Sequence, residues 1–380
     1  MAPELHSKEW GPGLNGRKFL LVLLLILVAG CGGLRPLEFS AQQNGDEQNE
    51  GEEQTPPTPA PRARVPLGTF TVDATTTTLS QTGLFRDLPN LLPAEGVIEY
   101  DVNVALFSDD ASKRRFMAVP SNAQITYSAN ASWTFPTGTI LIKHFDLQDS
   151  ATTKRKLETR LMVRGAAAWT FYLFIWNAAQ TDATISTATT TAPATYFDAG
   201  TGLSASRTWT FPAQQCNRCH IANSGFVLGV NTLQINRGFG AAVGAENQLV
   251  KLNRENFFNS DISLLGAQAS YPKLDDVAQP LELRAKAYLG VNCSHCHQPG
   301  GPNAFIDFRF ITPLANMNIV NVTGNAGIPR LVPSSKENSL MWNRILTAVP
   351  GGGTGRMPPV GRSVTHDLAV GLIGSWIDSL

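Results

Sequence analysis

The chain of 380 residues has few cysteines, few histidines and no excess of either charge. Five cysteines are too few for a disulfide-dense secreted scaffold, so stability must come from apolar burial and from any bound group. Basic and acidic residues balance at 30 each, which gives no reason to expect nucleic acid as a partner. The apolar run at 19–28 is too short for a permanent membrane-spanning helix.

Four of the five cysteines fall in two copies of Cys-x-x-Cys-His. This pattern is typical of covalent c-type haem attachment, because two thiols three residues apart reach the two vinyl groups of one porphyrin and the following histidine binds the iron. A four-cysteine zinc site or redox dithiols also use Cys-x-x-Cys, but neither requires both histidines. The sequence predicts two covalently bound haem c groups. The porphyrin-binding residues are Cys216, Cys219, Cys293 and Cys296, and the iron ligands are His220 and His297.

The N-terminus predicts export of the chain. Arg17 and Lys18 precede the run at 19–28, which has the length of a signal-peptide core. The run leads to Val28-Ala29-Gly30-Cys31, which resembles the bacterial lipobox, and the resemblance implies that Cys31 carries a lipid anchor. An ordinary signal peptide with Cys31 as a spare thiol is the alternative. We therefore expect residues 1–31 to be a lipoprotein signal peptide and the protein to be anchored in the bacterial cell envelope, facing the periplasm or the cell surface.

Two further regions precede the first motif. Residues 32–64 are acidic, then proline-rich, and predict a disordered tether. Residues 65–212 predict an antiparallel β-sandwich or barrel, with strands at 124–128, 139–143, 157–163 and 169–176, the last buried on both faces. We interpret the charged cluster at 109–115 and the pair Glu158 and Arg160 as surface ion pairs.

Residues 276–380 resemble a complete class I cytochrome c domain, so the fold class expected overall is multidomain α+β. The features that carry the resemblance are a helix at 280–289 leading into the second motif, the turn at 299–302, the run Arg356-Met357-Pro358-Pro359 and a final helix at 365–380. The resemblance implies that Met357 is the sixth iron ligand and that a loop carbonyl holds Nδ1 of His297. Histidine and methionine together raise the haem potential.

The helices of this region carry further expectations. Leu368, Leu372, Trp376 and Leu380 form one stripe on the final helix. Trp376 is expected to pack against Tyr288 or Leu289 of the first helix. His366, near the start of the final helix, is interpreted as structural.

The first haem-binding segment, 213–275, has one expected helix at 245–257 and no Met or His between His220 and Cys293. Its sixth ligand must come from elsewhere, be of another type or be absent. His144 ranks first by a small margin. The other side chains considered are Met117, Met162, Met317, Met341, Lys251, Lys273 and, as too constrained to favour, His295.

The whole of 65–380 resembles a family of predicted secreted dihaem c-type cytochromes that join a β domain to two Cys-x-x-Cys-His sites. The resemblance is carried by the two motifs and by Leu106-Phe107-Ser108-Asp109, Lys113-Arg114, Phe135-Pro136-Thr137-Gly138, Glu158-Thr159-Arg160, Trp176-Asn177, Leu228-Gly229 and Arg356-Met357-Pro358. It implies electron transfer between a redox protein donor and acceptor, which needs no catalytic acid, base or nucleophile. The alternatives are a peroxidase-like or other haem oxidoreductase with an open first haem, and a β domain that docks a protein or glycan.

Overall fold

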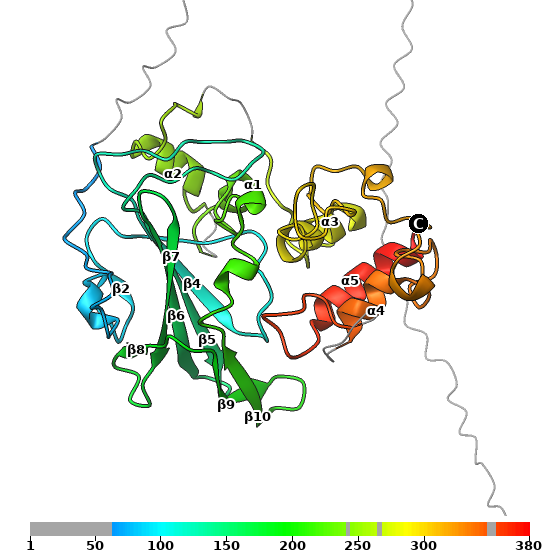
Figure 1. The fold of residues 1–380 in the computed structure, drawn as a ribbon, viewed down its shortest axis with the longest axis horizontal. Coiled ribbons are helices and arrows are strands. Elements are labelled where there is room, and N and C mark those ends of the chain that lie inside the picture. The colour runs from blue at the N-terminus through cyan, green and yellow to red at the C-terminus, as the bar shows by residue number, and fades with distance from the viewer. Residues whose placement is uncertain (1–62, 241–243, 264–267, 348–354) are drawn as a thin grey trace, which may run out of the picture. The chain divides into compact units, whose positions relative to one another are not determined.

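The computed structural model describes residues 63–240, 244–263, 268–347 and 355–380. Antiparallel sheets with a few helices make up these residues, which confirms the mixed α+β class at its coarse level (Figure 1). The predicted signal peptide, Cys31 and all but the last two residues of the predicted tether lie outside the described residues. No helix in the described ranges combines the length and the apolarity that a membrane crossing requires.

The centre of the fold is a six-stranded antiparallel sheet whose strands pair in sequence order, β3-β4-β5-β6-β7-β8. Its strands are β3 (Ile98–Tyr100), β4 (Ser112–Ala118), β5 (Ile140–Gln148), β6 (Lys154–Arg164), β7 (Trp169–Trp176) and β8 (Ala183–Ile185). Two separate hairpins are β1 (Phe85–Asp87) with β2 (Leu92–Pro93) and β9 (Thr190–Asp198) with β10 (Leu203–Phe211). Since β3 and β8 are the outer strands of the sheet, the architecture is an open meander, neither the predicted closed barrel nor a sandwich of two full sheets.

The strand predictions succeed where alternation is strong. The bounds of β7 match the prediction, and β5 and β6 extend beyond theirs. The expectation that β7 is buried on both faces holds only for its second half. Leu173 and Phe174, which point to opposite faces, are buried there with Trp176, whereas residues 169–172 are not buried. Residues 124–128 form no strand; they make isolated bridges from Ile125 and Thr126.

The two faces of the sheet are covered by different parts of the chain, as the alternation of side chains along a strand requires. One face carries Phe116, Ile142 and Leu161 and packs against the segment that precedes β3. The other face carries Met117 and Leu141, and packs against α1 (Thr232–Ile235) and α2 (Gln248–Arg254). The segment 213–275 therefore shares a hydrophobic core with the β domain, and α2 is shorter than the helix predicted at 245–257.

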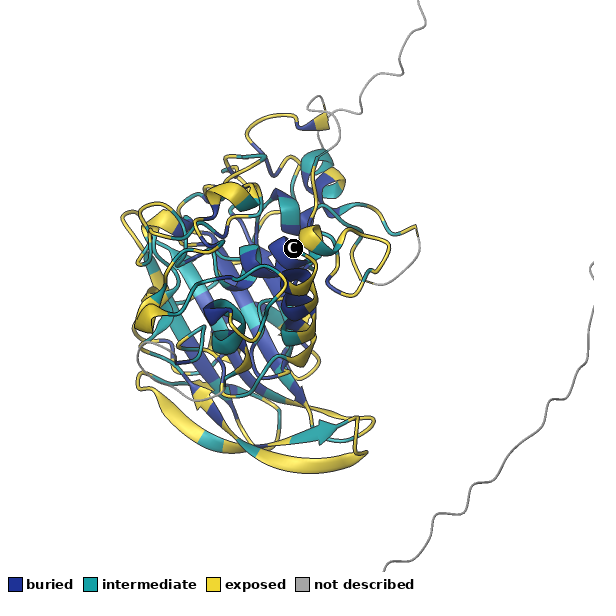
Figure 2. Cartoon of the chain, turned by 90° about the vertical axis from the view of Figure 1, so that its right-hand side faces the viewer, coloured by how far each residue is buried: buried dark blue, intermediate teal, exposed yellow. Residues whose placement is uncertain are grey.

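The hairpin β9–β10 covers the other end of this second face. Trp209 and Phe211 of β10 pack against Phe145 and Leu173 of the sheet. The rest of the hairpin is mostly exposed, whereas burial is concentrated in the sheet (Figure 2). Between the core with α1 and α2 and the core with the hairpin, polar side chains of β5 and β6 face inward.

The C-terminal region is built on α3 (Leu281–Asn292), α4 (Leu340–Leu346) and α5 (Asp367–Asp378). Trp376 of α5 shares a core with Tyr288 and Leu289 of α3, which confirms the predicted packing of first and last helices. The predicted stripe on the last helix is partly wrong, because Leu368 is 46% exposed. The buried face of α5 consists of Ala369, Leu372, Ile373, Trp376 and Ile377.

Candidate functional site

The structure brings the two Cys-x-x-Cys-His motifs together. The first forms a 3-10 turn, Cys216–Arg218, soon after β10 ends, and the second follows directly on α3. The sulfur of Cys296 lies 4.0 Å from the backbone oxygen of Arg218. Burial and then the neighbouring Cys296 raise the pKa of Cys219 to about 11. All four motif cysteines are free of disulfides, and burial raises the pKa of each thiol.

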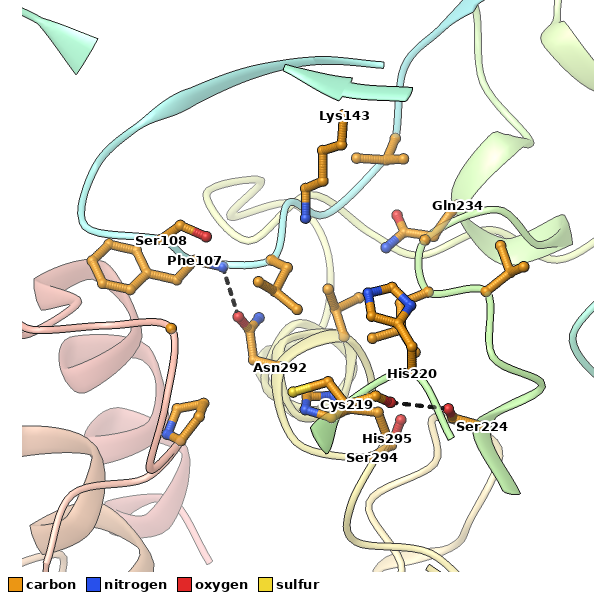
Figure 3. A pocket seen from close by; sticks show the side chains of 18 of the residues that line it. Phe107, Ser108, Lys143, Cys219, His220, Ser224, Gln234, Asn292, Ser294 and His295 are labelled. Atoms are coloured by element: carbon orange, nitrogen blue, oxygen red, sulfur yellow. Dashed lines mark hydrogen bonds between the residues drawn. The ribbon is translucent and has the colours of Figure 1, made fainter. Parts of the chain in front are cut away.

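A cavity of about 700 Å³ lies between the second face of the sheet and the two motifs. Cys216, Cys219 and His220 line it, and Ser294 and His295 reach it from the second motif (Figure 3). The volume is in the range of cofactor and ligand pockets. The first motif therefore opens onto a space large enough for a bound group.

The imidazole of His220 is held in one orientation. Its Nδ1 donates a hydrogen bond to the carbonyl oxygen of Phe226 at 2.6 Å, across a turn in which Gly225 and Phe226 both have positive φ. No hydrogen bond reaches Nε2 from any part of the chain that the structure describes. Burial lowers the pKa of His220 to about 4, which keeps the ring neutral. A neutral imidazole with Nδ1–H held by a carbonyl is the arrangement that presents Nε2 to a metal.

The second motif is arranged differently. The ring of His297 contacts Phe308, with 5.3 Å between ring centroids, and Nδ1 is buried without a hydrogen bond from the described residues. The expectation that a loop carbonyl holds this Nδ1 is wrong, because the loop closes on the backbone: the N–H groups of Gly301 and Asn303 donate to Gln298 and Cys296. A buried nitrogen without a hydrogen bond lowers the stability of the fold by about 1–3 kcal/mol, so the orientation of the His297 ring is not fixed in the way that of His220 is.

Met357 lies in the loop that forms one wall of the cavity. Arg356 and residues 358–363 line the cavity, but neither Met357 nor His297 does. The backbone N–H of Met357 donates to the carbonyl of Arg344 at 2.9 Å. No hydrogen bond joins Met357 to His297 among the residues described.

His144 is not available as the sixth iron ligand of the first site, so the prediction that ranked it first among the candidate ligands is wrong. Its Nδ1 lies 2.7 Å from the hydroxyl of Thr159 and its Nε2 lies 2.9 Å from Asp146. It also stands next to Lys143 on β5, so the two side chains point to opposite faces. Of the eight side chains considered for this role, Met162 and His295 line the cavity.

Sequence reasoning missed the cations on the cavity wall. Glu158 and Arg160 form an ion pair at 2.6 Å, but Glu158 is fully buried, so the interpretation as a surface pair is wrong. Arg115 was interpreted as part of a surface cluster, but it is buried, as is Asp109 of the same cluster. Lys143 was not singled out, although it lines the cavity together with Arg115. The available signal was a lysine at position 143 directly after the apolar run Ile140-Leu141-Ile142.

The run 106–109 connects the sheet to the C-terminal region. The N–H of Phe107 donates to Asn292 Oδ1 at 2.8 Å, at the end of α3 (Figure 3). The Asp109 carboxylate accepts from both the backbone and the hydroxyl of Ser363 at 2.7 Å. The ring of Phe107 stacks on His366 at 4.1 Å, in keeping with a structural role for His366. These contacts hold the Met357 loop against the sheet.

No three side chains of His, Cys, Asp or Glu within the described ranges lie close enough together to hold a metal ion. Comparison with protein-family models, with curated proteins and with solved structures finds no match.

Proposed function

We propose that the protein is a dihaem c-type cytochrome that passes electrons between redox proteins of the cell envelope. The observation that carries this proposal is the first motif: two free thiols and a histidine, oriented by a backbone carbonyl, open onto one cavity. The lipid anchor at Cys31, the envelope location and a cytochrome c domain over 276–380 belong to the same proposal.

The residues at the first motif fit a haem c. The thiols of Cys216 and Cys219 would hold it by thioether bonds, and Nε2 of His220 would bind its iron. Bound in this way, haem c supplies one-electron redox chemistry. The carbonyl of Phe226 fixes the plane and tautomer of the imidazole, which makes His220 a firmer ligand. Apolar side chains of the sheet and of the 227–235 segment, among them Leu141 and Val227, form part of the cavity wall.

The second motif supports a relay rather than a single redox centre. His297 and Met357 are the proposed ligands of its haem, and this ligand pair raises the potential. Electron transfer slows steeply with distance, and the 4.0 Å approach between Cys296 and Arg218 places the two attachment sites side by side. This proximity of the two motifs would favour electron transfer between groups bound at them.

A second candidate, a haem oxidoreductase that acts on a small molecule, is favoured by the polar cavity at the first motif. Both ring nitrogens of His144 already form hydrogen bonds. Of the side chains considered as the second protein ligand of the first haem, Met162 and His295 line the cavity, and a substrate could take this place instead. Substrate access to that position would make the first haem catalytic and the second its electron supply.

Haem content tests the proposal. We expect the chain, produced with a c-type maturation system, to contain two haems per chain by the pyridine haemochrome assay. Replacing Cys216 and Cys219 together by Ala should leave one haem. The matched control Cys31→Ala should keep both, because Cys31 lies outside the two motifs. A chain that carries no covalent haem would refute the proposal.

Carbon monoxide then separates the two candidates. If no ferrous haem binds carbon monoxide, both irons have firm sixth ligands and the relay is supported. If about half of the haem binds it, the first site is open and the oxidoreductase is supported. Met357→Ala should lower the potential of one haem and let that haem bind carbon monoxide; an unchanged potential and spectrum would remove Met357 as a ligand.

A further inference from the structure

The cavity has a strong excess of positive charge. Seven lysine and arginine side chains line it, against a single carboxylate, that of Asp109. The chain as a whole is balanced, at 30 basic and 30 acidic residues. Positive charge is therefore concentrated at this one interior surface, next to His220.

Three of these cations form a row across the sheet. Arg115 on β4 is paired in register with Lys143 on β5, and Lys143 is paired with Arg160 on β6. All three side chains line the cavity, and Figure 3 shows the Lys143 ammonium group pointing into the same pocket as the ring of His220. Residues directly opposite on neighbouring strands lie about 5 Å apart at Cβ, and like charges there destabilise a sheet.

The chain compensates this row only in part. Glu158 binds Arg160 through two hydrogen bonds of 2.6 and 3.0 Å. Arg115 donates to the backbone carbonyl of Lys113 at 3.5 Å, and the Lys143 ammonium lies 5.2 Å from the ring centre of Phe145. No carboxylate within the described residues forms an ion pair with Lys143 or Arg115.

Two other carboxylates of this region are already engaged. Asp109 accepts hydrogen bonds from Ser363 and from the N–H of Val364, and Asp101 pairs with Arg237 at 3.2 Å. Burial, followed by the neighbouring cations, lowers the pKa of Lys143 well below its usual value. Buried charge of one sign is costly unless it is paired, so negative charge from outside the polypeptide would be needed to hold all three side chains of the row in their charged form.

We propose that the row Arg115, Lys143 and Arg160 is an oxyanion site that binds a carboxylate or similar group inside the cavity. Arginine offers a planar fork that suits a carboxylate, and lysine adds a point charge. One source of this chemistry is a propionate of the haem attached at Cys216 and Cys219, which rests on the proposed function. The other source is a free oxyanion from solution.

The row also lies close enough to influence the redox centre. Lys143 and Arg160 line the same cavity as Cys219 and His220, and Figure 3 shows the Lys143 ammonium group and the His220 ring in the same pocket. Positive charge at this wall favours an added electron on a group bound at His220. A charged Lys143 would therefore raise the potential of the first haem.

The test compares Lys143→Met with the control Lys154→Met in the holoprotein. Lys154 is on the same sheet, is exposed and reaches only Ser112, at 3.2 Å, so the control removes the same charge outside the cavity. Haem per chain, the potential of each haem and the Soret spectrum during titration with sulfate, nitrite and acetate are measured. Both variants should keep two haems, and Lys143→Met alone should lower the potential of one haem.

The titration identifies the source of the oxyanion. If a free anion occupies the site, one of the three probes shifts the wild-type spectrum saturably and binds to Lys143→Met roughly tenfold more weakly or worse. If a haem propionate occupies it, no probe acts, and the propionate bending modes in the resonance Raman spectrum change in Lys143→Met alone. Equal potentials and equal anion responses in the two variants would overturn the oxyanion site. Absence of haem from the wild type would instead refute the proposed function.

Discussion

Replacement of Glu158 by Gln tests whether one buried carboxylate balances the cations of the cavity. Glu158 is fully buried and the Arg160 side chain is 30% exposed, toward the cavity. Removing one partner of a buried ion pair costs about 3–5 kcal/mol, because the other charge stays buried without compensation. Since Arg160 keeps some exposure, we expect the free energy of unfolding to fall by about 3 kcal/mol.

Urea unfolding followed by far-UV circular dichroism measures this change. For an m-value of roughly 3 kcal/mol per molar urea, the midpoint of Glu158→Gln should fall by about 1 M. The control is Glu99→Gln, which removes the same charge from the ion pair with Arg114 on the same sheet. That pair is partly exposed, so its loss should cost no more than about 1 kcal/mol. Equal losses in the two variants would refute the claim that Glu158 compensates the row.

Two further substitutions test the turn at His220 and the histidine near α5. Gly225 has a φ of +69°, and a Cβ at this position would collide with Ser132. Gly202 has a similar φ of +71°, but the space around it is open. Gly225→Ala should therefore destabilise the chain by about 1–3 kcal/mol more than Gly202→Ala. Thermal unfolding of the two variants checks this, and equal losses would contradict it. Burial lowers the pKa of His366 from 6.5 to about 4, so the unfolded state binds the proton first and stability is lost as the pH falls from 6.5 to 4. His366→Phe should flatten this loss in urea midpoints taken at pH 7 and 4.5, and an unchanged slope would count against it.

Several features of the fold followed from local sequence. The bounds of β7 and the existence of α3 and α5 were predicted, because each depends on the spacing of apolar residues within a short segment. The stripe on α5 was displaced: Leu368 is exposed, and the buried face includes Ala369 and Ile373. A helix offers several possible apolar stripes, and only the position of α3 selects the one that is buried.

The closure of the sheet depends on pairings that local patterns do not specify. Alternation predicts strands but not whether β3 meets β8, and the faces of the open sheet are instead covered by loops, helices and the β9–β10 hairpin. The engagement of His144 by Thr159 and Asp146 likewise depends on the register between β5 and β6.

The sequence by itself determined that each motif holds two thiols and an imidazole within five residues, because this spacing is set by a few covalent bonds along the chain. Only the tertiary structure decided that the two motifs lie together and that a backbone carbonyl orients His220. The same is true of the row Arg115, Lys143 and Arg160, which are paired on neighbouring strands and line one cavity. These residues come from strands and loops far apart in the chain, and they meet only through strand register and the packing of hydrophobic cores.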